Sequence, residues 1–156
     1  MGIEIERKFL VRGDGWRQQA AQQTRFSQGY LSRDPARTVR VRIAGDAAFL
    51  TIKGRITGAT RAEFEYEVPV ADAQALLALC DGPVVEKIRH LCPFAGMTWE
   101  VDEFLGANAG LVVAEIELTS EGQAFEHPAW LGDEVTGDGR YVNANLAVQP
   151  FSSWGA

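Results

Sequence analysis

The sequence has few cysteines, no excess of basic residues and no long apolar run, and each shortage excludes a class of protein. Cys80 and Cys92 lie far apart and form neither a CxxC pair nor a Cys/His cluster, so we expect neither a disulfide framework nor a zinc site. The net charge of -6 lacks the basic footprint of general nucleic-acid binders and anionic-membrane binders.

No segment approaches the roughly 18 apolar residues that a membrane-spanning helix needs. The opening stretch MGIEIERK carries charges where a signal peptide has its apolar region. We therefore expect a cytoplasmic protein without membrane or nucleic-acid partners. A chain of 156 residues with 46% hydrophobic content is predicted to form a single domain over 1–156.

Alternating apolar and polar residues predict antiparallel strands along most of the chain. The clearest is RTVRVRIAG (37–45), which Gly45-Asp46 turns into the next strand. The other predicted strands cover 3–11, 24–33, 47–55, 60–70, 84–94, 97–104 and 111–120, with helices over 13–23 and 71–81 and short helical pieces and loops after 120. This pattern predicts an α+β fold, mainly antiparallel β, in which the sheet is closed or nearly closed and helices pack outside it.

Charged residues recur two positions apart on nearly every predicted strand, which places each pair on one face of its strand. The acids are Glu4/Glu6, Glu63/Glu65/Glu67, Glu100/Asp102 and Glu115/Glu117, and the bases are Lys8, Arg40/Arg42, Lys53/Arg55 and Lys87/Arg89. On one strand alone, this would be a solvated face with weak salt bridges. The recurrence favours a charged lumen, with the apolar faces packed outward.

A lumen of buried charges is unfavourable unless a ligand completes it. Arginine and lysine pairs suit phosphate oxygens, and clustered carboxylates suit a hard divalent cation such as Mg²⁺ or Mn²⁺. The sequence contains neither GxxxxGK[ST] nor GxGxxG, so side chains rather than a glycine loop would hold the phosphates. The pattern therefore predicts a site for a multiply charged anion with metal ions.

These motifs closely resemble the CYTH proteins, also called triphosphate tunnel metalloenzymes. The resemblance begins with the ExExK signature Glu4-Ile5-Glu6-Arg7-Lys8 and continues, in the family's order, through VRVRI, LTIKG, EFEYEV, EKIR, WEVDEF, AEIEL and RYVNANL. It implies an eight-stranded antiparallel barrel whose tunnel binds a triphosphate with a divalent metal. A homodimer is expected only by analogy with the family.

The resemblance also implies roles for individual residues. Lys8, Arg40, Arg42, Lys53, Lys87 and Arg89 match phosphate ligands, and Arg55 and Arg61 are weaker candidates that could lie at the tunnel mouth. The matching metal ligands are Glu4, Glu6, Glu63, Glu65, Asp102, Glu115 and Glu117. Tyr30, in SQGYL, matches a tyrosine proposed to act with the ExExK lysine, Lys8, on the attacking water, although simple packing of Tyr30 is an equal alternative.

The expected activity is metal-dependent hydrolysis of a linear triphosphate, inorganic tripolyphosphate in the first place, to diphosphate and phosphate. Little sequence is left over for a nucleoside or thiamine pocket, and Trp16, Trp99 and Trp130 are expected in the core. Three alternatives stay open: a thiamine triphosphatase, a class IV adenylate cyclase, and a non-catalytic module that binds polyphosphate or nucleotide.

Overall fold

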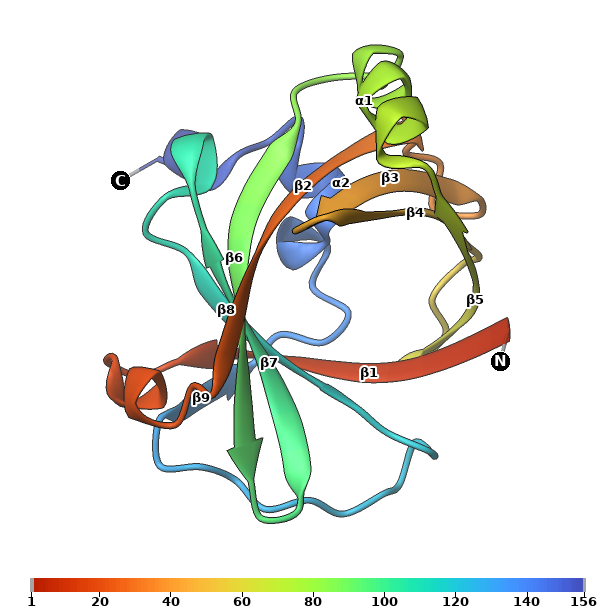
Figure 1. Ribbon diagram of the computed structural model, residues 1–156. Helices are drawn as coiled ribbons and strands as arrows, with labels where there is room; N and C mark the ends of the chain where they lie inside the picture. Colours follow the sequence, from red (N-terminus) through yellow and green to blue (C-terminus); the bar gives the residue numbers. More distant parts are fainter. Residues whose placement is uncertain (1, 156) are drawn as a thin grey trace.

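The computed structural model describes residues 2–155 and shows a closed antiparallel β-barrel (Figure 1). Its strands are β1 (Gly2–Val11), β2 (Gln22–Ser32), β3 (Thr38–Ala44), β4 (Ala47–Lys53), β5 (Thr60–Val68), β6 (Val85–Phe94), β7 (Met97–Phe104) and β8 (Val112–Glu117). They are hydrogen-bonded in the order β5-β4-β3-β2-β6-β7-β8-β1, and β5 also pairs with β1, which closes the sheet. The predicted eight-stranded barrel with a few peripheral helices is confirmed.

The β3–β4 hairpin shows how the sequence sets the register of the sheet. Ala44 pairs with Ala47 across the two-residue turn Gly45-Asp46, and Gly45 adopts a φ of 61°, which is strained for residues with a Cβ. From this turn onward Val41 pairs with Leu50. Because side chains alternate along each strand, this register sends the apolar residues outward and the arginines of β3 into the barrel.

Two of the three hydrophobic clusters lie outside the barrel wall. Helix α1 (Val70–Ala78) packs its Ala73 against Val41 of β3 and Ala48 of β4, all fully buried. A second cluster gathers the three tryptophans predicted for the core, Trp16, Trp99 and Trp130, together with Phe9 and Ile116. A third surrounds Tyr141 and Leu146 in the C-terminal elements η3 (Gly139–Tyr141), α2 (Asn143–Leu146) and η4 (Phe151–Ser153). The first two clusters thus leave the lumen free for polar side chains, while the third borders it, because Tyr30 and Ala144 belong to this cluster and also line the cavity.

Two local predictions are wrong. The stretch 13–23 forms only the 3₁₀ helix η1 (Gly15–Gln18), because the buried Trp16 anchors a short turn and β2 already begins at Gln22. The strand β9 (Leu131–Glu134) was not predicted. It pairs with the C-terminal end of β1 and is too short to show an alternating pattern. A further short 3₁₀ helix, η2 (Gly106–Asn108), follows β7. Within residues 2–155 no helix is long and apolar enough to cross a membrane.

The barrel is fastened at the β1–β5 seam by a carboxylate from the loop after β8. Glu121 accepts hydrogen bonds from the backbone N–H of Ala59, at 3.0 Å, and from the hydroxyl of Thr60. The carbonyl of Ala59 in turn accepts from the backbone N–H of Glu6 at 3.0 Å. A Cβ on Gly58, whose φ is +64°, would lie 3.2 Å from both Glu121 carboxylate oxygens. The turn before β5 is therefore shaped to receive Glu121, and it holds the backbone of the ExExK segment.

Replacing Glu121 by Ala is expected to destabilise the protein by about 1–2 kcal/mol, since it removes charge-assisted hydrogen bonds at the seam. For a chain of this size, each kcal/mol lowers the melting temperature by roughly 2–4 °C. The matched control is Glu126→Ala, because the exposed Glu126 side chain makes no hydrogen bond or ion pair within the described residues. Equal melting temperatures for the two variants would show that the Glu121 contacts do not stabilise the barrel.

Candidate active site

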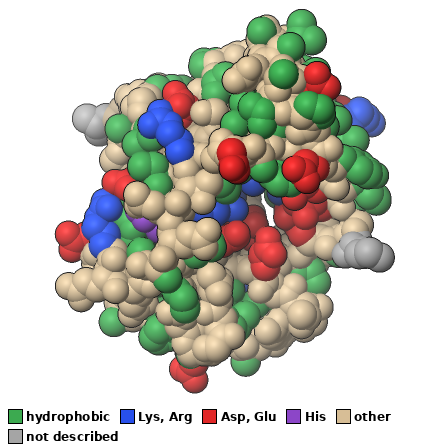
Figure 2. All heavy atoms as spheres, in the orientation of Figure 1, with side chains coloured by type: hydrophobic (Ala, Val, Ile, Leu, Met, Phe, Trp, Pro, Cys, Tyr) green, Lys and Arg blue, Asp and Glu red, His purple; other side chains and the backbone are tan. Residues whose placement is uncertain are grey.

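The lumen of the barrel is a cavity of about 250 Å³ lined mainly by charged side chains. Figure 2 shows it as a hollow with acidic side chains around the opening and basic side chains inside. The residues predicted from the sequence that line it are Glu4, Glu6, Lys8, Tyr30, Arg40, Arg42, Lys53, Arg61, Glu63, Glu65, Lys87, Arg89, Glu115 and Glu117. The structure thus brings most of the predicted site into one space.

The two arginines of β3 present free donors to this space. Arg42 uses its Nε to reach Gln28 Oε1 at 2.9 Å, while its remaining N–H groups have no hydrogen-bond partner among residues 2–155. Burial, with the nearby charges of Arg40 and Arg89, lowers the pKa of Arg42 to about 9. Arg40 donates from Nη2 to Thr51 and to Glu65, while its Nη1 makes no hydrogen bond within the described chain. Both guanidinium groups therefore suit an anion that enters the lumen.

A second basic pair, Lys87 and Arg89, forms ion pairs with Asp102. Lys87 Nζ lies 2.7 Å from Asp102 Oδ2, and Arg89 Nε lies 2.8 Å from Asp102 Oδ1. Burial alone would raise the pKa of Asp102, but Arg89 and Lys87 outweigh it and hold this pKa well below its usual range. Asp102 is not among the cavity-lining residues. Its oxygens already accept hydrogen bonds from both cations, so its geometry fits an anchor for them better than the predicted metal ligand.

Lys8 of the ExExK segment lies between the acids and the C-terminal segment. Its Nζ is 3.3 Å from Glu115 Oε2 and donates to the carbonyl of Tyr141 at 3.4 Å. Burial lowers the pKa of Lys8, but the carboxylates of Glu115 and Glu6 outweigh it, and the pKa is raised overall. Lys8 is therefore a charged group at neutral pH.

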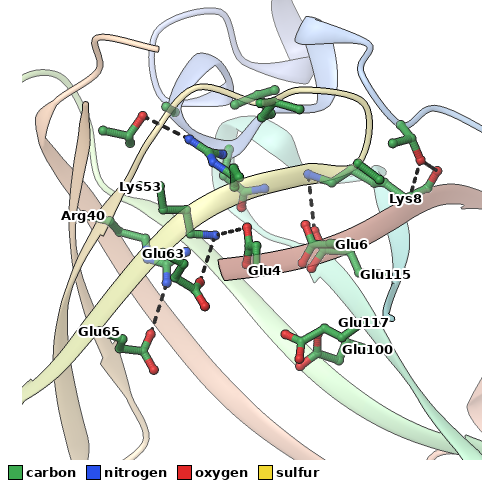
Figure 3. Close-up of a pocket in the computed structure, with 18 of the residues that line it drawn as sticks. Glu4, Glu6, Lys8, Arg40, Lys53, Glu63, Glu65, Glu100, Glu115 and Glu117 are labelled. Atoms are coloured by element: carbon green, nitrogen blue, oxygen red, sulfur yellow. Dashed lines mark hydrogen bonds and ion pairs between the residues drawn. The ribbon is translucent and has the colours of Figure 1, made fainter. Parts of the chain in front are cut away.

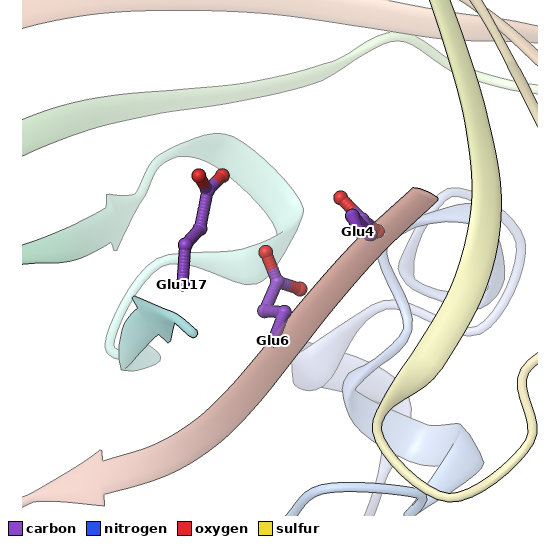
Figure 4. Close-up of side chains that lie close together, drawn as sticks. All are labelled: Glu4, Glu6 and Glu117. Carbon is purple, nitrogen blue, oxygen red and sulfur yellow. The ribbon is translucent and has the colours of Figure 1, made fainter. Parts of the chain in front are cut away.

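Carboxylates from β1, β7 and β8 gather on one side of the lumen (Figure 3). Oxygen atoms of Glu6, Glu100 and Glu115 lie within 4.8 Å of one another, and so do those of Glu4, Glu6 and Glu117. Figure 4 shows Glu4 and Glu6 of β1 and Glu117 of β8 directed toward a common space. Glu6 belongs to both groups, so the two groups share one side chain.

These carboxylates fit a divalent cation because basic side chains neutralise only some of them. Glu115 is paired with Lys8 and Arg89, whereas Glu6, the member that both groups share, makes no ion pair among residues 2–155. Burial, followed by the charge of Glu115, raises the pKa of Glu6 to about 8. Burial also raises the pKa of Glu100 to about 7 despite Arg89 nearby, and Glu100 Oε1 is buried without a hydrogen-bond partner among the described residues. An oxygen-rich site with excess negative charge is what Mg²⁺ or Mn²⁺ prefers in proteins.

The remaining predicted acids lie on the β4–β5 side of the lumen. Lys53 Nζ is 2.9 Å from Glu4 and 3.4 Å from Glu63, while Arg40 Nη2 is 3.5 Å from Glu65 (Figure 3). Glu63 and Glu65 are thus paired with basic side chains and belong to neither of the two carboxylate groups that share Glu6, although Lys53 links Glu63 to Glu4.

The sequence analysis missed some residues of the site, and two residues that it predicted there, Asp102 and Arg55, do not line the cavity. Glu100 lines the cavity, although only its neighbour Asp102 was selected from the same acidic pair. Phe26 lies in the basic region, with its ring centroid 4.4 Å from Arg42 Cζ and 5.0 Å from Arg89 Cζ. Its even spacing from Tyr30 could have revealed its direction. Arg55 follows β4 as an exposed residue and does not line the cavity.

Sequence comparison finds related proteins whose matches cover almost the whole chain. The family model of the CYTH domain matches residues 2–142. A protein of Acetivibrio thermocellus named inorganic triphosphatase is 50% identical over 155 residues, which cover 99% of each chain. An inorganic triphosphatase of Nitrosomonas europaea is 37% identical over 152 residues, covering 93% of this chain and 97% of its own.

Comparison with solved structures also finds an inorganic triphosphatase. A crystal structure of an inorganic triphosphatase is 36% identical and superimposes with a TM-score of 0.65. The match covers 92% of this chain and 93% of the other. The similarity therefore includes the strands that carry the charged lumen.

Divalent cations are expected to stabilise the protein more at about pH 8.5 than at about pH 6. In the cation-free protein, the pKa values of Glu6 and Glu100 are raised to about 8 and about 7. As the pH rises, these two groups therefore lose their protons at a lower pH in the unfolded chain than in the folded protein. Stability from both groups is therefore complete below the ordinary pKa of about 4.5 and is lost as the pH rises through 7 to 8. A bound cation removes this loss, because it favours the ionised carboxylates.

The measurement is the shift in melting temperature on adding MnCl₂ at each pH. Glu100→Gln should reduce the difference between the two shifts, while Glu126→Gln, at an exposed position, should leave it unchanged. Equal shifts at both pH values in the unmodified protein would contradict a metal site at these carboxylates.

Proposed function

The chain belongs to the CYTH domain family, and from this membership and its charged lumen we propose that it is a divalent-metal-dependent inorganic triphosphatase. The substrate is inorganic tripolyphosphate, which the protein hydrolyses to diphosphate and phosphate. The single observation that carries the proposal is one cavity in which the free N–H groups of Arg42 adjoin carboxylates whose oxygen atoms lie within 4.8 Å of one another, including Glu6 with its raised pKa.

The basic residues bind the phosphates. Arg40 and Arg42 have free guanidinium donors that can take phosphate oxygens. Arg89 adds positive charge nearby, and Lys87 does so when it is protonated, because burial lowers its pKa to about 7. Asp102 fixes the positions of both side chains. Because these side chains are already oriented before the substrate enters, little reorganisation is needed to stabilise charge that develops during phosphoryl transfer.

The metal, Mg²⁺ or Mn²⁺, would be held by Glu6 together with Glu115 and Glu100, or with Glu4 and Glu117. When bound, such a cation neutralises charge on the phosphate oxygens and makes a coordinated water more acidic. The protein's own contribution is to keep these carboxylates close together, although their mutual repulsion opposes this.

Lys8 and Tyr30 lie where they can contact the reacting phosphoryl group or the attacking water. Both line the cavity, Lys8 beside Glu115 and Tyr30 beside Gln28. Lys8 is charged at neutral pH because of Glu115 and Glu6, so it acts as a point charge toward the phosphate. Hydrolysis needs mainly such positioning and charge neutralisation.

The compactness of the chain supports tripolyphosphate rather than an organic triphosphate. Trp16, Trp99 and Trp130 are buried in the outer core and do not line the cavity, so they offer no stacking surface for a base or thiazolium ring there. A single domain over 1–156, a cytoplasmic location and a possible homodimer stay predictions alongside this function.

Turnover of tripolyphosphate, ATP and thiamine triphosphate in the presence of Mg²⁺ or Mn²⁺ tests the substrate. The expected result is a kcat/KM for tripolyphosphate at least roughly tenfold above the other two, equivalent to about 1.4 kcal/mol of transition-state discrimination. Phosphate release and cyclic AMP formation are measured together. A preference for thiamine triphosphate, cyclic AMP from ATP, or tight binding without phosphate release would each replace the proposal by one of its alternatives.

Replacing Lys8 by Met is expected to lower kcat by roughly 100-fold, the scale of losing one preorganised electrostatic contact to the reacting group. The matched control is Arg25→Met, because Arg25 is exposed and pairs only with Glu86 on the outer surface. If Lys8→Met kept full turnover with a folded protein, Lys8 would have no role in the reaction.

A further inference from the structure

Gln28 is a fully buried polar residue that no part of the proposed reaction uses. It lies on β2 directly opposite Arg42 of β3, and its side chain is 0% exposed. Its amide makes three contacts: Oε1 accepts from Arg42 Nε at 2.9 Å, and Nε2 donates to Tyr30 Oη at 3.0 Å and to Asn143 Oδ1 at 3.1 Å. A buried amide with all these partners has one fixed orientation.

The orientation of this amide is fixed from both of its ends. Arg42 can only donate hydrogen bonds, so the Gln28 atom that faces it must be the oxygen. At the other end, Lys87 Nζ donates to Asn143 Oδ1 at 2.9 Å, so Asn143 also presents its oxygen to Gln28. Flipping the Gln28 amide would set its NH₂ group against the Arg42 donor and its oxygen against the Asn143 oxygen. The NH₂ group of Gln28 is therefore committed to Tyr30 and Asn143.

This commitment determines what the hydroxyl of Tyr30 can do. Tyr30 is 3% exposed and lines the cavity. Its oxygen receives the hydrogen bond from Gln28, so its own proton must point elsewhere. No group among residues 2–155 accepts a hydrogen bond from that hydroxyl, and the direction left for the proton is the lumen.

We propose that Gln28 is a positioning residue that fixes Tyr30 as a hydrogen-bond donor toward the phosphate substrate. The inference rests on the proposed function and goes further, because it gives the tyrosine a defined polarity. Tyr30 stabilises charge on a phosphate oxygen by donating to it, and no proton is transferred. Gln28 itself does not line the cavity, so its effect reaches the substrate only through Tyr30 and Arg42.

A double-mutant cycle separates this role from a merely structural one. Gln28→Glu keeps the shape and the acceptor for Arg42, but it replaces the donor at Tyr30 by an acceptor, which turns the hydroxyl proton away from the lumen. Tyr30→Phe removes the hydroxyl altogether. If Gln28 acts through Tyr30, each single variant lowers kcat for tripolyphosphate by roughly tenfold or more, and Gln28→Glu causes less than about a further threefold loss in the Tyr30→Phe background.

The added negative charge of Gln28→Glu also weakens phosphate binding, but it does so in both backgrounds, so KM should rise equally with and without the Tyr30→Phe substitution. If Gln28→Glu does not fold, Gln28→Met gives a second cycle. It lacks the donor without adding charge, and its loss of the acceptor for Arg42 affects both backgrounds equally, so the part of the kcat loss that disappears in the Tyr30→Phe background is the part that acts through Tyr30. The matched control is Gln23→Glu, an exposed position on the same strand, which should leave kcat and KM unchanged.

The inference would be overturned if Gln28→Glu lowered kcat by the same factor in the Tyr30→Phe variant as in the unmodified protein. That result would leave the triphosphatase proposal intact. Absence of tripolyphosphate turnover in the unmodified protein, measured in the same assay, would overturn the proposed function and the inference together.

Discussion

The need to neutralise charged groups inside a closed barrel governs the structure and its chemistry. An isolated ion is unfavourable in a protein interior unless it is paired and hydrogen-bonded. Part of the lumen meets this requirement internally, since Asp102 pairs with both Lys87 and Arg89. Another part does not, because Glu6 and Glu100 keep raised pKa values and Arg42 keeps free donors. The unsatisfied groups are acids and bases side by side, and a polyanion bound with divalent cations satisfies both.

The fold supports this arrangement by placing two of its three hydrophobic clusters outside the barrel wall. Val41 and Ala48 pack outward under α1, and Trp99 packs outward in the tryptophan cluster. Adjacent residues on the same strands, such as Arg40 and Arg42, therefore face inward without a core residue being lost. Stability and binding thus depend on opposite faces of the same strands.

The barrel and most of its lumen could be predicted from the sequence because strand alternation fixes the direction of each side chain. Once Val39 and Val41 are assigned outward, Arg40 and Arg42 must point inward, and the same reasoning places Glu115 and Glu117. Spacing alone cannot decide which of two neighbouring acids contacts the ligand, which is why Asp102 was selected where Glu100 lines the cavity. The roles of Gln28 and Asn143 depend on hydrogen bonds between residues 115 positions apart, and no local pattern carries that information. The strand β9 and the turn around Trp16 were missed for a related reason, since tertiary packing rather than periodicity determines them.

Diffraction from crystals grown with Mn²⁺ and tripolyphosphate, recorded at the manganese absorption edge, decides whether a triphosphate and its divalent cation complete the charged lumen. We expect an anomalous peak in contact with Glu6 and at least one of Glu115, Glu100 and Glu117, with phosphate density against Arg40 and Arg42. Manganese and phosphate bound only on the outer surface, with the lumen carboxylates and arginines free of both, would contradict this role of the lumen.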